Sequence, residues 1–119
     1  MSSPWLACGA ACCTVSVIAG AFGAHGLESR LSAPDLENWE IGARYLMYGG
    51  LGLLVLGLRS APEATAWPPI LLLAGSVIFS ATLFVLALGG PRWFGAITPL
   101  GGLGMILGFA LLGWEALRG

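Results

Sequence analysis

Four long apolar segments, separated by short polar stretches, follow one another along the 119 residues of the chain. They cover residues 5–24, 41–58, 70–88 and 97–116. Each is close to the ~20 residues that a helix needs to cross a hydrocarbon layer of roughly 30 Å. Lipid offers no hydrogen bonds to the backbone, so such segments cross as helices. The pattern predicts an all-α integral membrane protein, with residues 1–119 forming a single domain, a bundle of four transmembrane helices.

The polar stretches contain the signals that mark helix starts. Residues 32–35, Ser-Ala-Pro-Asp, place a serine, a proline and an acidic side chain where the first turn of a helix prefers them, so we expect a helix from about Ala33. Thr98 and Pro99 lie at the start of the fourth segment, with the threonine as the expected N-cap and the proline in the first helical position. Pro68 and Pro69 end the second polar stretch.

The tryptophans give an independent test of this layout, because the indole ring prefers the level of the lipid headgroups. Trp5, Trp67 and Trp114 fall at segment ends on one membrane face, and Trp39 and Trp93 fall on the other. Both termini are therefore expected on the same face. The arginines of the two faces differ in number by one, which does not decide which face is cytoplasmic.

Composition supports the membrane interpretation and excludes other classes. The chain is 57% hydrophobic and 9% charged, with a mean hydropathy of +0.87, and a soluble domain of this length could not bury so much apolar surface. Its net charge is −1 and it has no cluster of basic residues, so we expect no nucleic-acid partner. No positive charge precedes the first apolar segment, so we expect a membrane span there rather than a cleaved signal peptide.

Metal and cofactor sites are not indicated. Cys8, Cys12 and Cys13 all lie in the first apolar segment, where cysteine acts as a small apolar side chain. Cys8 and Cys12 share a helix face and could hold a soft metal, but no other Cys or His lies nearby in sequence to complete a ligand set. We therefore predict no metal and no cofactor.

Small residues recur at helical spacing in the first and fourth segments. Without a hydrophobic drive between helices in lipid, small side chains are what allow two helices to approach closely. The positions expected to pack against neighbouring helices are Ser16, Gly20, Ala24, Gly104 and Gly108.

A polar cluster is expected at the face opposite the termini, where the first and third polar stretches meet. Its expected members are His25, Glu28, Arg44, Arg92 and Thr98. We expect His25 to bond a backbone carbonyl or a carboxylate and so to hold the end of the first helix. Any lipid headgroup or partner should bind beside Arg44 and Arg92. A purely structural histidine makes the same geometric prediction without a ligand.

Three classes of function remain open: an accessory membrane subunit, a small-solute transporter, and a membrane enzyme or cofactor holder using His25. No charged residue or histidine lies in the middle of a predicted span, and ion or proton paths usually need one. Catalysis would have to rely on one histidine without a carboxylate at bilayer depth. We therefore favour a structural or accessory subunit without catalytic residues. Its partners would be membrane lipid and either a larger membrane complex or further copies of itself.

Several motifs resemble one known family. They are GAFGAHGL at 20–27, Trp39 with Ala43-Arg44-Tyr45, Phe79-Ser80 with Leu83, ITPLGG at 97–102, and Gly113-Trp114. This set resembles the domain-of-unknown-function family 423, small bacterial inner-membrane proteins with mitochondrial relatives called transmembrane protein 256. The resemblance implies a four-helix, multi-pass protein of the bacterial inner membrane without an established activity. Family members place a histidine after a Tyr-x-Met-Tyr run, whereas Gly49 follows Tyr48 here, so any bis-histidine haem or metal site of the family should be missing.

Overall fold

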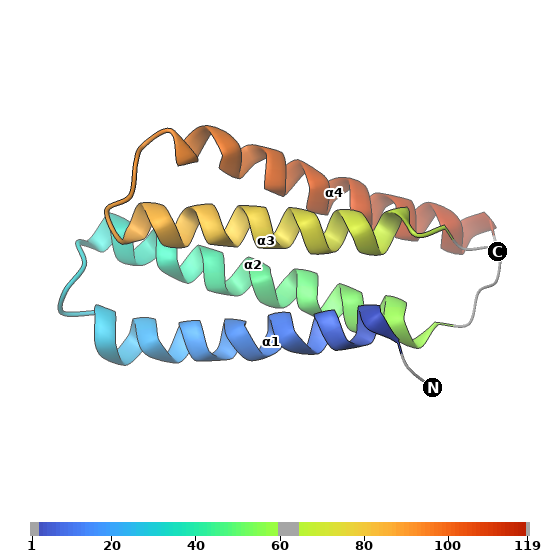
Figure 1. The fold of residues 1–119 in the computed structure, drawn as a ribbon, viewed down its shortest axis with the longest axis horizontal. Helices are drawn as coiled ribbons and strands as arrows, with labels where there is room; N and C mark the ends of the chain where they lie inside the picture. The colour runs from blue at the N-terminus through green and yellow to red at the C-terminus, as the bar shows by residue number, and fades with distance from the viewer. Residues whose placement is uncertain (1–2, 60–64, 119) are drawn as a thin grey trace.

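The computed structural model describes residues 3–59 and 65–118. In this part of the chain the elements are α1 (Pro4–Phe22), a π-helical turn η1 (Gly23–Leu27), α2 (Ala33–Leu58), α3 (Trp67–Ala87) and α4 (Phe94–Arg118). The four described helical segments are long and apolar enough to cross a membrane. Figure 1 shows the start of α1 and the end of α4 at the same end of the molecule. The predicted all-α fold and its topology are therefore confirmed.

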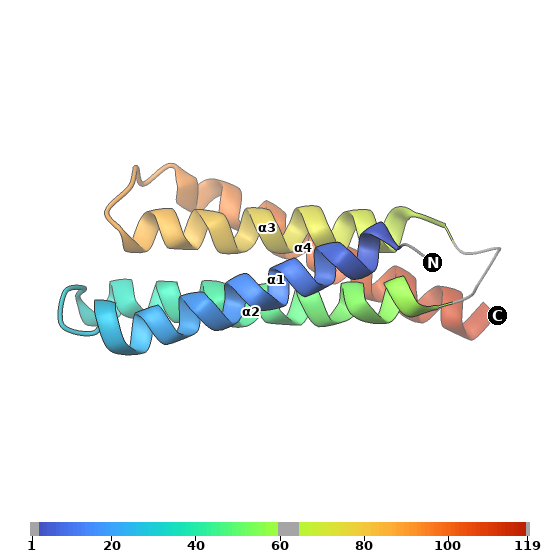
Figure 2. The same ribbon diagram turned by 60° about the horizontal axis from the view of Figure 1, so that its bottom comes forward.

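The helices pack in chain order: α1 packs against α2, α2 against α3, and α3 against α4 (Figure 1). Figure 2 shows α1 crossing obliquely over α2. Within the apolar spans, 44% of the α2 residues and 39% of the α3 residues are buried, against 28% for the first span and 22% for α4. The two central helices thus form the core, and the two outer helices keep most of their apolar surface free.

Glycines bring neighbouring helices into direct backbone contact. A Cβ atom added to Gly75 of α3 would lie 2.7 Å from the carbonyl oxygen of Gly101 in α4. One added to Gly9 of α1 would lie 2.8 Å from the carbonyl oxygen of Gly50 in α2. Such approaches supply the van der Waals contact that replaces hydrophobic association in lipid.

The residues expected to pack along α1 need a correction. Ser16 is buried and donates a hydrogen bond of 2.6 Å to the Ala43 carbonyl of α2. Gly20 and Ala24, however, are exposed, and a Cβ on Gly20 would meet nothing within 4 Å. Positions that are regularly four residues apart drift by about 40° per step around a helix. Positions with alternating spacings of three and four residues stay on one face. The buried face of α1 accordingly contains Gly9, Cys12, Ser16 and Ala19 and continues to Gly23.

The two positions expected to pack on α4 lie against α3. A Cβ on Gly104 would be 3.2 Å from the Cα atom of Gly75, and one on Gly108 would be 2.9 Å from the Leu72 side chain. Gly108 is buried and Gly104 is half-buried.

One predicted helix start is correct and another is wrong. Ser32 caps α2, because its hydroxyl accepts a hydrogen bond from the Asp35 amide at 3.3 Å. Thr98 is not an N-cap, since α4 already begins at Phe94 and Pro99 lies inside the helix. The Thr98 hydroxyl donates to the Phe94 carbonyl at 3.1 Å and shares a 2.6 Å hydrogen bond with Thr82 of α3. The threonine therefore joins two helices instead of starting one.

Two buried serines are expected to respond differently to truncation. The Ser80 hydroxyl is buried without a hydrogen-bond partner among the described residues, and such a group costs about 1–3 kcal/mol. Ser80→Ala should therefore leave the free energy of unfolding unchanged or raise it. Ser16→Ala removes an interhelical bond and should lower this free energy by about 0.6 kcal/mol. Denaturation in mixed detergent micelles, followed by circular dichroism, measures both; an equal loss in the two variants would contradict the assignment.

Candidate functional site

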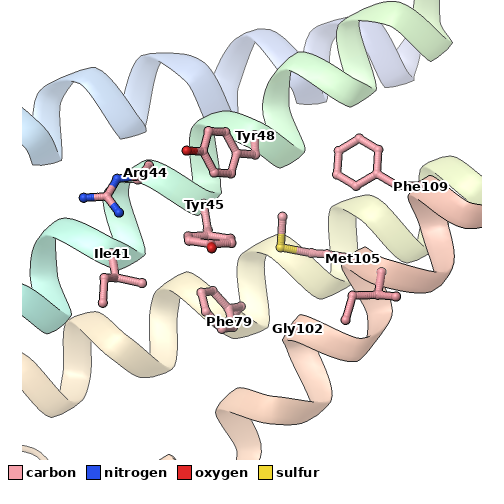
Figure 3. A pocket seen from close by; sticks show the side chains of 9 residues that line it. Ile41, Arg44, Tyr45, Tyr48, Phe79, Gly102, Met105 and Phe109 are labelled. Atoms are coloured by element: carbon pink, nitrogen blue, oxygen red, sulfur yellow. The ribbon is translucent and has the colours of Figure 1, made fainter.

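A groove of about 560 Å³ runs between α2 and α4, with α3 beneath it. Figure 3 shows the side chains that face it from the three helices. They are Ile41, Arg44, Tyr45 and Tyr48 of α2, Phe79 of α3, and Gly102, Met105, Ile106 and Phe109 of α4. The groove exists because α2 and α4 each pack against α3 and diverge from each other along part of their length.

Contacts near the end with the chain termini hold α2 and α4 together and close the groove there. The Arg59 guanidinium at the end of α2 forms an ion pair of 3.0 Å with the Glu115 carboxylate of α4. The Thr65 hydroxyl donates a 2.6 Å hydrogen bond to the same carboxylate. Closer to the groove, a Cβ on Gly52 of α2 would lie 2.9 Å from the Phe109 ring. The groove therefore widens toward the opposite end of the bundle.

Aromatic rings form one wall of the groove. The ring of Tyr45 lies 5.1 Å from the ring of Phe79 and 5.0 Å from the ring of Tyr48, measured between centroids. Met105 is buried and points between α2 and α3 in Figure 3. Such a surface is shaped to receive a flexible apolar chain, because methionine adapts to irregular contacts and the rings offer large flat areas.

Arg44 is the one charged residue among the side chains that line the groove. It is exposed, and it forms no ion pair within residues 3–59 and 65–118. Figure 3 shows its guanidinium pointing away from the groove interior, toward the start of α2. Side chains on a helix lean toward its N-terminus, and an arginine can keep its apolar stem along the protein while its charge reaches the headgroups.

The other residues of the expected polar cluster are not brought into contact. His25, Glu28 and Arg92 are exposed, and their side chains make no hydrogen bond or ion pair within the described ranges. The segments that carry them, η1 with the residues after it and the α3–α4 connection, do lie at the same end of the bundle (Figure 1). Thr98 is buried against Thr82. The expected hydrogen bond from His25 is therefore not found, and another residue holds the end of α1.

That residue is Trp39, for which the sequence predicts a place at the level of the lipid headgroups. It is only 8% exposed, and its indole N–H donates a 2.7 Å hydrogen bond to the Ala19 carbonyl of α1. Its ring also packs on the ring of Phe84 in α3, with centroids 4.5 Å apart. A Cβ on Gly23 would lie 2.7 Å from this ring, which explains why a glycine stands there.

The bond to Trp39 coincides with a change in the hydrogen bonding of the first helix. The Ala19 carbonyl accepts both the indole N–H and the amide of Gly23. At Gly23 the helix widens into η1, which runs to the buried residue Leu27. Insertion of a side chain into the backbone ladder is a known cause of such local widening. The glycine-rich motif thus serves first as the joint between α1 and α2.

The described residues contain no group of three His, Cys, Asp or Glu side chains that could hold a metal ion. Cys8, Cys12 and Cys13 are free thiols on α1. Gly49, at the position where the resemblance implied a histidine, faces α3, and a Cβ there would lie 2.6 Å from the Ser76 hydroxyl. An imidazole at position 49 has no room in this packing.

Comparison with known families gives one match, to the family described as "Protein of unknown function (DUF423)", over residues 19–102. The chain belongs to the DUF423 family. The matched region includes Ala19, Gly23 and Trp39, as well as the groove residues of α2 and α3. In this DUF423 protein, the joint between α1 and α2 therefore lies within the part of the chain that defines the family.

Relatives of this DUF423 protein are named membrane proteins. It is 47% identical to a UPF0382 membrane protein of Staphylococcus haemolyticus over 106 residues, which cover 87% of each chain. It is 48% identical to one of Staphylococcus saprophyticus over 82% of this chain and 83% of the relative. The UPF0382 membrane protein YwdK of Bacillus subtilis is 38% identical over 83% of this chain and 84% of its own. No solved structure matches the chain.

Proposed function

We propose that this DUF423 protein is a structural or accessory subunit of the bacterial inner membrane, where it packs against a larger membrane complex or against a second copy of itself. The observation that carries this proposal is the open arrangement of the helices. The first span and α4 each have one extensively packed neighbour and bury only 28% and 22% of their span residues. A surface of this kind is available to another helix.

The outer face of α4 is the larger of these surfaces. Its exposed side chains include Leu100, Leu103 and Leu107. Helix association in lipid depends on close contact and not on burial from water. This face of α4 can therefore contact either lipid or a partner protein. The inner membrane is the compartment that suits it, because the relatives are bacterial membrane proteins and outer membranes hold β-barrels instead of helical bundles.

The chemistry of the described spans supports binding over transport or catalysis. Their buried polar groups are serine and threonine hydroxyls, most of which bond to backbone carbonyls of the bundle. Arg44, the charged residue that lines the groove, points toward the start of α2 and forms no ion pair with an acidic residue among the described residues. Proton-coupled transport uses ionisable pairs or chains within the bilayer, and no observation here favours one.

Photocrosslinking in native membranes tests the accessory role. A photoreactive amino acid at Leu103 of α4 or Ile18 of α1, both exposed, should give a protein adduct of defined mass. The same group at Leu53 is the matched control, because this residue is fully buried within the bundle, outside the groove lining, and should crosslink only internally. Mass spectrometry of the adduct then shows whether the partner is another protein or a second copy. Lipid adducts alone at both exposed positions would overturn the proposal.

A further inference from the structure

The groove between α2 and α4 has a composition that matches a lipid and not water. Apart from Arg44, its lining consists of aliphatic and aromatic residues, methionine and glycine. Water is poorly held by such a surface, whereas hydrocarbon chains of the bilayer have free access to the open side of a groove in a membrane protein. An apolar chain is therefore the expected filling, and the charged residue at its edge indicates what that chain is attached to.

We propose that this groove binds one anionic phospholipid, with an acyl chain along the Tyr45, Phe79 and Met105 wall and the headgroup phosphate bound by Arg44. This binding is a property of the isolated chain, so it does not depend on the proposed accessory role.

The depth of Arg44 fits a phosphate at the boundary of the hydrocarbon layer. The apolar part of α2, residues 41–58, has its middle near position 49 or 50, which places the Arg44 backbone about 8 Å from the middle at 1.5 Å per residue. The hydrocarbon boundary lies about 15 Å from the middle. Because the side chain points toward the start of α2, its length covers most of this difference. The guanidinium thus lies close to the hydrocarbon boundary, where a lipid phosphate can approach it.

The Arg44 side chain itself favours a headgroup with a net negative charge. A guanidinium binds phosphate oxygens through two parallel hydrogen bonds, and Arg44 has no carboxylate partner among the described residues. A zwitterionic headgroup would also bring an ammonium group, and the lining contains no acidic residue to receive it. An anionic headgroup such as phosphatidylglycerol carries no such cation.

The width of an acyl chain suits the groove. A helix is about 10 Å across, whereas a single acyl chain is much narrower and can lie along the lining side chains between α2 and α4.

Native mass spectrometry of the purified protein, with phosphatidylglycerol or phosphatidylcholine added to the detergent, tests the proposal. We expect one bound phosphatidylglycerol per chain, retained at least tenfold more strongly than phosphatidylcholine. Arg44→Gln should remove this tenfold preference. Arg30→Gln is the matched control, because Arg30 is an exposed arginine after η1, outside the groove, and its loss should leave the preference unchanged.

A second variant tests the chain-binding part of the groove. Gly102 lies in the lining, and a Cβ there would meet the Phe79 ring at an ordinary distance of 3.4 Å, so Gly102→Leu should fill the groove while the helices keep their packing. It should weaken binding of both lipids. Equal retention of the two lipids by the wild-type protein, or phosphatidylglycerol binding that survives Arg44→Gln, would overturn the proposal. Unchanged retention of both lipids by Gly102→Leu would do so as well.

Discussion

Replacing Gly101 with alanine is expected to disrupt the packing of α4 on α3 and to lower the free energy of unfolding by about 3 kcal/mol. The added Cβ would lie 2.8 Å from the Gly75 carbonyl oxygen and 2.8 Å from the Phe79 Cα atom. Both of these are backbone atoms, so no side-chain rotation relieves the overlap, and the helices must separate. Denaturation in mixed detergent micelles, followed by circular dichroism, measures the loss.

Gly20→Ala provides the matched control for this prediction. It makes the same chemical change inside a helix, but a Cβ at position 20 would meet nothing within 4 Å. Because alanine favours a helix over glycine by up to about 1 kcal/mol, this variant should be as stable as the wild type or slightly more stable. If the Gly101 and Gly20 variants unfold at the same detergent composition, backbone contact does not determine the packing of α4.

Close approaches at glycines join all three pairs of consecutive helices. Gly9 of α1 meets the backbone of α2, Gly49 of α2 meets Ser76 of α3, and Gly75 of α3 meets the backbone of α4. In lipid, where apolar side chains gain little by leaving the solvent, these close approaches provide much of the specificity of the fold. Most of the glycines within the described helices therefore lie where a side chain would meet a neighbouring helix.

Hydropathy was sufficient to predict the number and topology of the helices. A membrane span must be both long and apolar, so few alternative arrangements of the four segments exist. The helix ends were less accurate: α3 and α4 begin at Trp67 and Phe94, three residues before the predicted spans. Interfacial first turns contain tryptophan, proline and glycine, and hydropathy cannot distinguish them from a loop.

The face of each helix that packs was harder to predict. Gly20 and Gly23 are both small and both belong to the same motif, yet only Gly23 is buried. A span that is apolar on all sides has no polar face to indicate the direction of its neighbours. The two glycines differ in their distance from Trp39, which lies 16 residues after Gly23 in the chain. The Trp39 ring is next to Gly23 and not next to Gly20.

The groove could be predicted from the sequence only in part. Arg44 is predicted as a lipid or partner contact because it belongs to the polar cluster expected where the first and third polar stretches meet. Tyr45, Phe79 and Met105, in contrast, come from three different helices, and no local pattern connects them. Their proximity follows from the divergence of α2 and α4 above α3, which depends on the glycine contacts at each interface.

The second large effect is expected at Trp39. Trp39→Ala should lower the free energy of unfolding by roughly 3 kcal/mol, because it leaves a cavity between α1 and α3 and removes the bond to the Ala19 carbonyl. Trp39→Phe keeps most of the ring volume and loses only the indole N–H, so its cost should be about 1 kcal/mol. The same detergent denaturation measures both variants.

Trp93 provides a control that distinguishes the loss of the joint between α1 and α2 from a general effect of removing a tryptophan. It lies in the α3–α4 connection, at the same end of the bundle, and is 61% exposed. Trp93→Ala should change stability by less than about 0.5 kcal/mol. Hydrogen exchange adds a local test: Trp39→Phe should accelerate exchange of the amides of η1, such as that of Gly23, while those of α4 keep their protection. Equal losses for Trp39→Ala and Trp93→Ala, with unchanged exchange in η1, would show that Trp39 does not hold the end of α1.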